Sequence, residues 1–229
     1  AGTAAGSRAA GVIDRPRRLE HMALHTGQHM LSQALLLEAD APTVSARLGE
    51  STCTIDLDRP SLREGAVACA EALVNDLIDA RRSIRAFFPT AAELATLKLR
   101  RTPKVEHDIR VVEVEGFDVT PCGGTHCGNT SEVGLVQVVG IERYKGKMRL
   151  SFVSGRRARA ELGRDSRALN AIARELSTSA QELAAAIQKL RTELGAERSR
   201  SGALARQLGA NRGIELARLA RERGETRVV

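Results

Sequence analysis

Four side chains of the types that bind metal ions occur in this chain as two spaced pairs. His25 and His29 are four positions apart in a segment with helical periodicity, so both imidazoles lie on one helix face, close enough to bind one ion. Cys122 and His126 form the second pair, and the glycines between them allow a tight turn and a close backbone approach to a ligand. Three imidazole nitrogens and one thiolate are a donor set that suits zinc. The spacing leaves open a structural zinc ion and a loop that needs no metal.

The elements that must position these pairs are a helix and a glycine-rich loop held between strands. Apolar periodicity predicts helices over residues 17–39, 61–85 and 91–99, and strands over residues 44–48, 52–57, 109–114, 133–139 and 147–153. The segment from Phe117 to Gly134, dense in Gly, Thr, Cys and His, is predicted as a loop. Mixed helices and antiparallel strands indicate the α+β class, an antiparallel sheet with packed helices.

The last third of the chain differs from the rest in pattern and charge. Leucines recur every seven residues from Leu162 to Leu190, which predicts a coiled coil or a helical hairpin, with a plain amphipathic helix as the alternative. Glycines beyond residue 195 argue against a continuous helix there. Residues 156–229 contain 16 Lys/Arg and 9 Asp/Glu, which accounts for the whole net charge of +7. A polyanion such as RNA would meet this segment first, although a solvated helix surface explains the charge equally well.

Composition excludes several other classes of protein. Aromatic residues make up 2% of the chain and tryptophan is absent, so rows of aromatic side chains stacking on bases are not expected. No apolar run approaches the roughly 20 residues of a membrane span. The first 15 residues suggest a flexible leader and not a signal peptide. Four cysteines are too few for a disulfide scaffold, which favours a reducing, cytoplasmic location. Of these, Cys53 and Cys69 are expected in the core, and Cys127 beside the metal site or in packing.

Two motifs together resemble a known domain. HTGQH (His25–His29) and CGGTH (Cys122–His126) are similar to the zinc-binding pairs of the editing domain shared by alanyl-tRNA synthetases and free-standing alanyl-tRNA editing proteins. The likeness extends through VSARLGESTCTIDLD (Val44–Asp58) and RLSFVSGRRA (Arg149–Ala158), and covers residues 17–158. The form of both motifs is closer to the free-standing proteins.

The resemblance implies a fold of the type called the tRNA synthetase second additional domain, and a hydrolase that removes serine or glycine from mischarged tRNA(Ala). It makes His25, His29, Cys122 and His126 the ligands of Zn²⁺. Four protein ligands describe a closed site, so catalysis through the metal requires a loose ligand, for which Cys122 or His126 is expected. Thr125 and Gln28 are candidate substrate contacts, and each is equally well explained as a local stabilising group.

The resemblance also predicts an organisation and an alternative. We expect a leader over 1–15, a zinc-binding editing domain over 16–158 and a basic arm over 159–229 that forms a homodimer through residues 160–195. About 24 residues precede His25, too few for the aminoacylation domain or the small β-barrel that many relatives carry. The alternative is a truncated, non-catalytic module of the synthetase type that binds tRNA or a partner through its arm. The sequence contains no Walker-type loop, which argues against ATP use. It also contains no HExxH motif, which argues against protease activity.

Overall fold

A computed structural model describes residues 6–8, 10–50 and 52–222 of the chain. The chain divides into two compact units, residues 1–163 and 164–229, and each is described by itself. Residues 1–5 and 9 of the predicted leader lie outside the described residues. None of the helices in the described ranges combines the length and apolar content that crossing a bilayer requires.

Helix α1 (Arg15–Ala39) is the central element of the first unit. It begins at Asp14, whose side chain accepts a hydrogen bond from the Arg17 backbone N–H, and ends at Asp40, which adopts a left-handed conformation at φ 46°. Its core-facing apolar side chains, among them Leu24, Met30, Leu31 and Leu35, are fully buried, whereas Leu19 and Leu37 are exposed. A helix of this length, packed along one face, is a rigid support for any side chain it carries.

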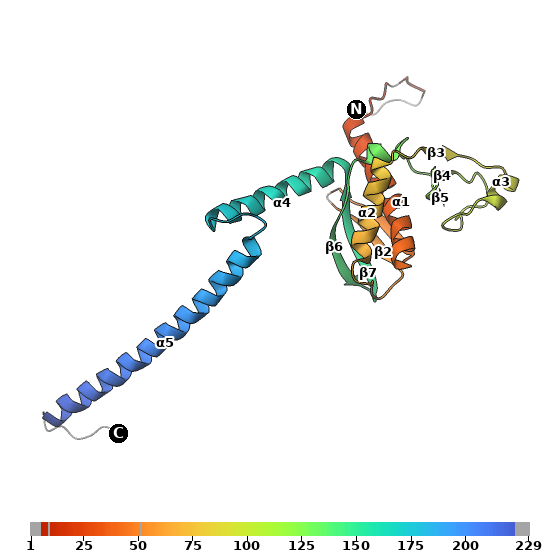
Figure 1. The fold of residues 1–229 in the computed structure, drawn as a ribbon. Helices are drawn as coiled ribbons and strands as arrows, with labels where there is room; N and C mark the ends of the chain where they lie inside the picture. The colour runs from red at the N-terminus through yellow and green to blue at the C-terminus, as the bar shows by residue number, and fades with distance from the viewer. Residues whose placement is uncertain (1–5, 9, 51, 223–229) are drawn as a thin grey trace. The chain divides into compact units, whose positions relative to one another are not determined.

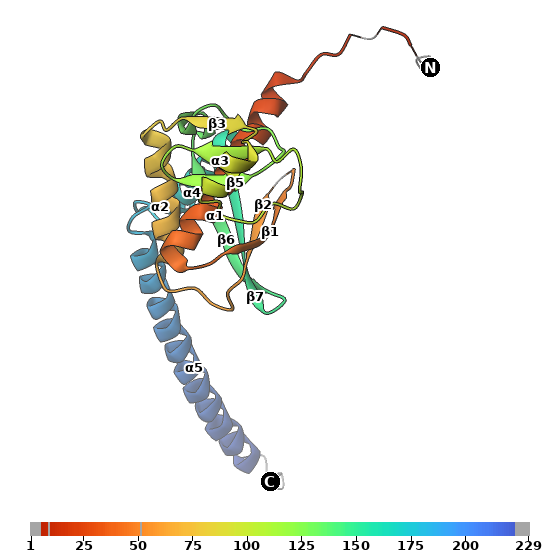
Figure 2. The same cartoon turned by 90° about the vertical axis from the view of Figure 1, so that its right-hand side faces the viewer.

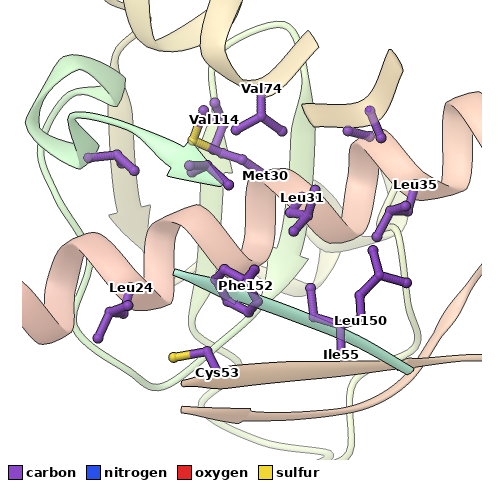
Figure 3. Packing of buried hydrophobic residues seen from close by; sticks show 14 of the residues in the cluster. Leu24, Met30, Leu31, Leu35, Cys53, Ile55, Val74, Val114, Leu150 and Phe152 are labelled. Atoms are coloured by element: carbon purple, nitrogen blue, oxygen red, sulfur yellow. The ribbon is translucent and has the colours of Figure 1, made fainter. Parts of the chain in front are cut away.

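A four-stranded antiparallel sheet covers that apolar face. Its strands are β1 (Thr43–Leu48), β2 (Cys53–Leu57), β6 (Val136–Tyr144) and β7 (Lys147–Ser154), in the order β1-β2-β7-β6. Figure 3 shows Ile55, Leu150 and Phe152 of the central strands lying against α1. Helix α2 (Ala66–Asp79) lies alongside α1 and contributes Val74 to the same core (Figures 1 and 3).

A second, smaller antiparallel sheet leads into the loop that carries Cys122. It consists of β3 (Ile84–Phe87), β4 (Val111–Val114) and β5 (Asp118–Pro121), in that order, with the short helix α3 (Ala91–Thr96) between β3 and β4 in sequence. Figure 1 shows this sheet to one side of α1 and α2, and Figure 2 views the molecule from that side. Cys122 follows β5 directly, and the loop ends at the 3-10 helix η1 (Thr130–Val133).

The predicted α+β class, antiparallel sheet with packed helices and long C-terminal helix, is confirmed. Several predicted elements were wrong in detail. The helix predicted over 61–85 is shorter, and its last residues form β3 instead. The predicted loop contains β5, whose buried residues, Asp118 and Thr120, are polar, so no apolar alternation marks the strand in the sequence. Cys53 is buried as expected, whereas Cys69 is exposed on α2.

The C-terminal part is helical, as predicted. Helix α4 (Gly155–Glu175) and helix α5 (Leu183–Glu222) are separated by a short turn that the leucine pattern did not reveal, with Ser177 at φ 51°. The expectation that glycines weaken the helix from about residue 195 was wrong, because α5 continues through Gly195, Gly202, Gly209 and Gly213. Large apolar side chains along these helices are exposed, among them Leu169, Ile172, Ile187, Leu190, Leu194 and Leu204.

Candidate metal centre and its surroundings

The two spaced pairs, almost a hundred residues apart in sequence, meet in space. His25, His29, Cys122 and His126 each offer one ligand atom, and these four atoms all lie within 4.8 Å of one another. The Sγ atom of Cys122 lies 3.5 Å from Nε2 of His25 and 3.4 Å from Nε2 of His126. Ligands held at ordinary zinc distances around a tetrahedron stand roughly 3.6 Å apart. The donor set and its spacing therefore fit a zinc ion.

Gly124 allows the loop to approach the helix. A β-carbon built at Gly124 would lie 2.6 Å from Nδ1 of His25, which no real β-carbon tolerates. The Gly124 backbone N–H donates to Sγ of Cys122 at 3.4 Å. The neighbouring Gly123 has open space around it. Only the second glycine of the motif is thus required by packing against a ligand.

Thr26 orients the loop ligand His126. Its hydroxyl accepts a hydrogen bond from the Cys127 backbone N–H at 3.0 Å and bonds Nδ1 of His126 at 3.2 Å. The other ring nitrogen of His126 faces Cys122. Thr26 is fully buried, and Cys127 is buried in the hydrophobic core, so packing is the role of that thiol.

A buried charge pair lies behind His29. The Nδ1 atom of His29 is buried without a hydrogen-bond partner among the described residues, 3.9 Å from Oδ2 of Asp118. Asp118 is held in turn by Nε and Nη2 of Arg100, at 2.8 and 3.1 Å, and by the hydroxyl of Thr120. A carboxylate that accepts a hydrogen bond from a ligating imidazole fixes its orientation and raises its basicity. At 3.9 Å, Asp118 is beyond hydrogen-bond distance of His29, so here it places a negative charge behind the most deeply buried of the four candidate ligands.

Arg110 fixes the backbone of the glycine loop. Its Nη1 donates to the carbonyl oxygens of Cys122 and Gly124, at 2.8 and 2.7 Å. Both carbonyls belong to the turn that carries the ligands, so these bonds hold the loop without the help of a metal. Such preorganisation lowers the entropic cost of ordering the ligands when an ion binds.

The three histidines are held in their neutral form, which is the form that binds metals. Burial lowers the pKa of His29 well below its usual value, and the neighbouring His126 and His25 lower it further. Burial is also the main reason that the pKa of His126 falls to about 3. For His25, burial lowers the pKa more than a backbone hydrogen bond with Thr125 raises it. Protons therefore compete only weakly with a metal for these nitrogens near neutral pH.

A pocket of about 440 Å³ adjoins the cluster. His25 and His29 line it together with Gln28, the strand β1 and the segment after α3. Gln28 is buried and donates to Oγ of Ser32 at 2.8 Å, with its side chain in the pocket wall. Thr125 is exposed, and its backbone contacts His25. Of the two candidate substrate contacts, Gln28 is the one that lines the pocket.

Sequence reasoning missed Thr26, Arg100, Arg110 and Asp118. Thr26 lies inside the first ligand motif, and this position was the only available signal. The other three are distant in sequence from the residues they support, and their type is common on protein surfaces. Their contacts depend on the pairing of β4 with β5 beside α1. This pairing cannot be read from local sequence patterns.

Comparison with known proteins gives a consistent result. Residues 109–151 match the family described as the Threonyl and Alanyl tRNA synthetase second additional domain. The chain is 36% identical over 157 residues to the alanyl-tRNA editing protein Aarsd1 of Rattus norvegicus, covering 66% of this chain and 38% of that protein. It is 30% identical over 153 residues to the alanyl-tRNA editing protein AlaX-M of Methanosarcina barkeri, covering 64% of this chain and 62% of the relative.

A synthetase is also similar to this chain. The alanine–tRNA ligase of Ignicoccus hospitalis is 35% identical over 166 residues, which cover 68% of this chain and 18% of the ligase. The chain thus spans less than two thirds of the length of each of these relatives. The matched segment contains Cys122 and His126 on their glycine loop, between the strands described above. The chain is therefore similar to alanyl-tRNA editing proteins over about two thirds of its own length, and its residues 109–151 match the second additional domain of threonyl and alanyl tRNA synthetases.

Proposed function

We propose that this chain is a zinc-dependent hydrolase that removes serine or glycine from mischarged tRNA(Ala), acting in trans. The observation that carries the proposal is the convergence of three neutral imidazoles and one thiol beside a polar pocket. The names of the relatives, which are alanyl-tRNA editing proteins, support the reaction and the tRNA.

His25, His29, Cys122 and His126 would hold the zinc ion. When bound, zinc polarises an ester carbonyl and lowers the pKa of a coordinated water. His29 is the most buried of the four side chains, whereas Cys122 and His126 belong to the partly exposed loop. This difference supports one loop ligand, Cys122 or His126, and not His29, as the ligand that yields when substrate enters.

The other residues of the site position the substrate and keep the ligands in place. Gln28 is our candidate for a hydrogen bond to the aminoacyl group, because it lines the pocket within one turn of both α1 histidines. Thr125 is the candidate on the loop side, next to His126. Thr26 bonds Nδ1 of His126 and so leaves Nε2 of that ring facing Cys122, and Asp118 places its carboxylate 3.9 Å from Nδ1 of His29.

We propose a division of labour along the chain, with the editing chemistry in residues 16–158 and tRNA contact in the basic arm, residues 159–229. The exposed apolar side chains of α4 and α5 support pairing with a second copy through residues 160–195. All four cysteines are free thiols, which supports a reducing cytoplasm as the place of action.

The test is incubation of the purified, zinc-loaded protein with seryl-, glycyl- and alanyl-tRNA(Ala), with and without a chelator. We expect release of serine and glycine, sparing of alanine, and loss of hydrolysis when zinc is removed. His29→Ala should lose zinc and hydrolysis together, whereas His107→Ala, which changes an exposed histidine outside the cluster, should keep both. Binding of tRNA without any release of amino acid would instead support the non-catalytic module.

A further inference from the structure

Basic side chains meet the metal cluster at the pocket wall. The pocket beside His25 and His29 is also lined by Arg100, Arg101 and Lys104, from the segment that follows α3. Positive charge beside a metal site is costly unless an anion compensates it. A cation among these three can bind an anionic ligand only if it is not already paired with a carboxylate of the protein.

Arg100 is already paired. Its guanidinium makes two hydrogen bonds to the buried Asp118, and its side chain is 10% exposed. It therefore supports His29 from behind and is not available to a ligand in the pocket.

Arg101 and Lys104 are exposed and largely unoccupied. One nitrogen of Arg101, Nη2, donates to the carbonyl of Pro121 at 3.0 Å, which anchors the guanidinium beside Cys122. Its remaining N–H groups point to no acceptor within the described ranges. For Lys104, no hydrogen bond or ion pair is found among the described residues. Two cationic side chains beside the site are thus available to bind an anion.

The same two side chains line a second cavity. This cavity, of about 310 Å³, adjoins Cys122 and Gly123 and is also lined by Arg110 and Asp108. Arg110 is bound to the loop carbonyls, and Asp108 is the one carboxylate among the described residues that line it. Arg101 and Lys104 therefore border both the pocket beside the histidines and the cavity beside the ligand loop.

We infer that Arg101 and Lys104 form a phosphate subsite that binds the 5′-phosphate of the terminal nucleotide whose ribose carries the aminoacyl ester. This inference rests on the proposed function. An ester placed at the cluster has its nearest anion on the 5′ side of the same nucleotide. A guanidinium binds two phosphate oxygens at once, and an ammonium adds a point charge. By binding the phosphate of the nucleotide that carries the ester, the subsite would position the ester at the cluster, independently of contacts elsewhere on the tRNA.

Two non-hydrolysable probes test this inference on the zinc-loaded full chain. The first is adenosine with serine joined to the 3′ position through an amide, and the second is the same compound with a 5′-phosphate. Isothermal titration calorimetry at low salt should show the phosphorylated probe binding about 10-fold tighter or more, because hydrogen bonds between charged groups replace solvent contacts. Raising the salt concentration should reduce this ratio.

Variants assign the effect to the two residues. Arg101→Gln combined with Lys104→Gln should bring the ratio close to one, and Lys104→Gln alone should give an intermediate ratio. Lys104 makes no hydrogen bond or ion pair within the described residues, so misfolding does not confuse the result of the single variant. Arg143→Gln, which removes an exposed charge of β6 that borders neither cavity, should keep the wild-type ratio.

The outcomes separate the inference from the function on which it rests. Equal affinity of the wild-type protein for the two probes overturns the subsite and leaves the proposed function standing. A ratio that survives in the double variant overturns the assignment to Arg101 and Lys104. If neither probe binds, the proposed function is overturned, and the subsite falls with it.

Discussion

At the scale of single residues, the site depends on contacts that tolerate little change. Gly124 lies against the His25 ring, Thr26 bonds His126, and Asp118 stands behind His29. Each of these residues acts on a different ligand, from a different element. Three of the four candidate ligands therefore each have a different neighbouring residue beside them, and each contact can be tested by a separate substitution.

The two loop glycines offer a matched pair of substitutions. Gly124→Ala should displace the His25 ring and weaken zinc binding about 10-fold or more, because its β-carbon would overlap that ring. Gly123→Ala should bind zinc like the wild type, since nothing lies within 4 Å of its β-carbon. Competition with a chromogenic chelator measures both affinities. Equal loss in the two variants would contradict the packing argument.

Asp118→Asn should weaken both zinc binding and the fold. Arg100 would be left with a buried charge and no carboxylate, a change that costs about 3–5 kcal/mol in buried pairs. Loss of the group behind His29 should lower zinc affinity roughly 10- to 100-fold. Urea unfolding of the metal-free protein and chelator competition give the two quantities. Asp58→Asn is the control, since that carboxylate is exposed and pairs with Lys147 at the surface; a similar loss there would argue against this role.

The histidine cluster also predicts how stability depends on pH in the metal-free protein. Burial lowers the pKa values of His25, His29 and His126 in the folded state, for His126 to about 3, so below pH 6.5 the unfolded chain binds more protons. The contribution of these histidines to the free energy of unfolding should be fully present above pH 6.5 and should decrease as the pH decreases toward 3. Urea titrations at pH 7.5 and 5 measure the difference. A free energy of unfolding that stays constant between them would show that the imidazoles are not buried as described.

At the scale of elements, the fold is held together where helix meets strand. Asn75 of α2 accepts a hydrogen bond from the Val136 N–H at 3.0 Å and donates to its carbonyl at 2.9 Å. The side chain thus pairs with β6 as a neighbouring strand would. This contact fixes α2 against the sheet on which α1 also packs.

Asn75→Ala should therefore destabilise the first unit by about 1–3 kcal/mol, since it leaves the polar backbone atoms of Val136 unpaired. Asn170→Ala is the matched control, because Asn170 is exposed and its side chain bonds Ser166 of its own helix. Its effect should stay within about 0.5 kcal/mol. Chemical unfolding followed by circular dichroism compares the two. Equal destabilisation would mean that the bridge between α2 and β6 contributes nothing.

The elements also show where sequence patterns are sufficient. Helix α1 was predicted to within two residues because its apolar period is sustained over 25 residues. The strand β4 was predicted, whereas β3 and β5, which have the same length, were missed because their conformation depends on pairing with β4. The helix α5 passes through its glycines, at a cost of about 1 kcal/mol each relative to alanine, because the residues around them favour helix.

At the scale of the whole molecule, the candidate metal cluster and most of the excess positive charge belong to different units. All four ligands belong to residues 1–163, while residues 164–229 carry 13 Lys/Arg and 8 Asp/Glu. The first turn of α4 stays with the first unit, where Arg157 pairs with Glu20 and donates to the Gly49 carbonyl. The boundary after Gly163 is therefore the place to divide the chain.

Removing residues 164–229 should weaken tRNA binding while zinc content stays unchanged. The dependence of binding on salt should become shallower, by about one in log–log slope for each phosphate that the shortened protein no longer neutralises. Filter binding at several salt concentrations, together with metal analysis, measures both effects. An unchanged slope would show that the C-terminal unit makes no phosphate contacts.

The sequence by itself determined the ligand types, their pairing and the long helices, because metal chemistry depends on residue type and helices on local periodicity. It also carried the resemblance to alanyl-tRNA editing domains, through two motifs that stand in the right order. Only the tertiary structure decided that α1 and the loop after β5 lie within ligand distance, and that Asp118, Arg100 and Arg110 support them. These contacts join residues far apart in the chain, and the pairing of short strands that creates them has no local signature.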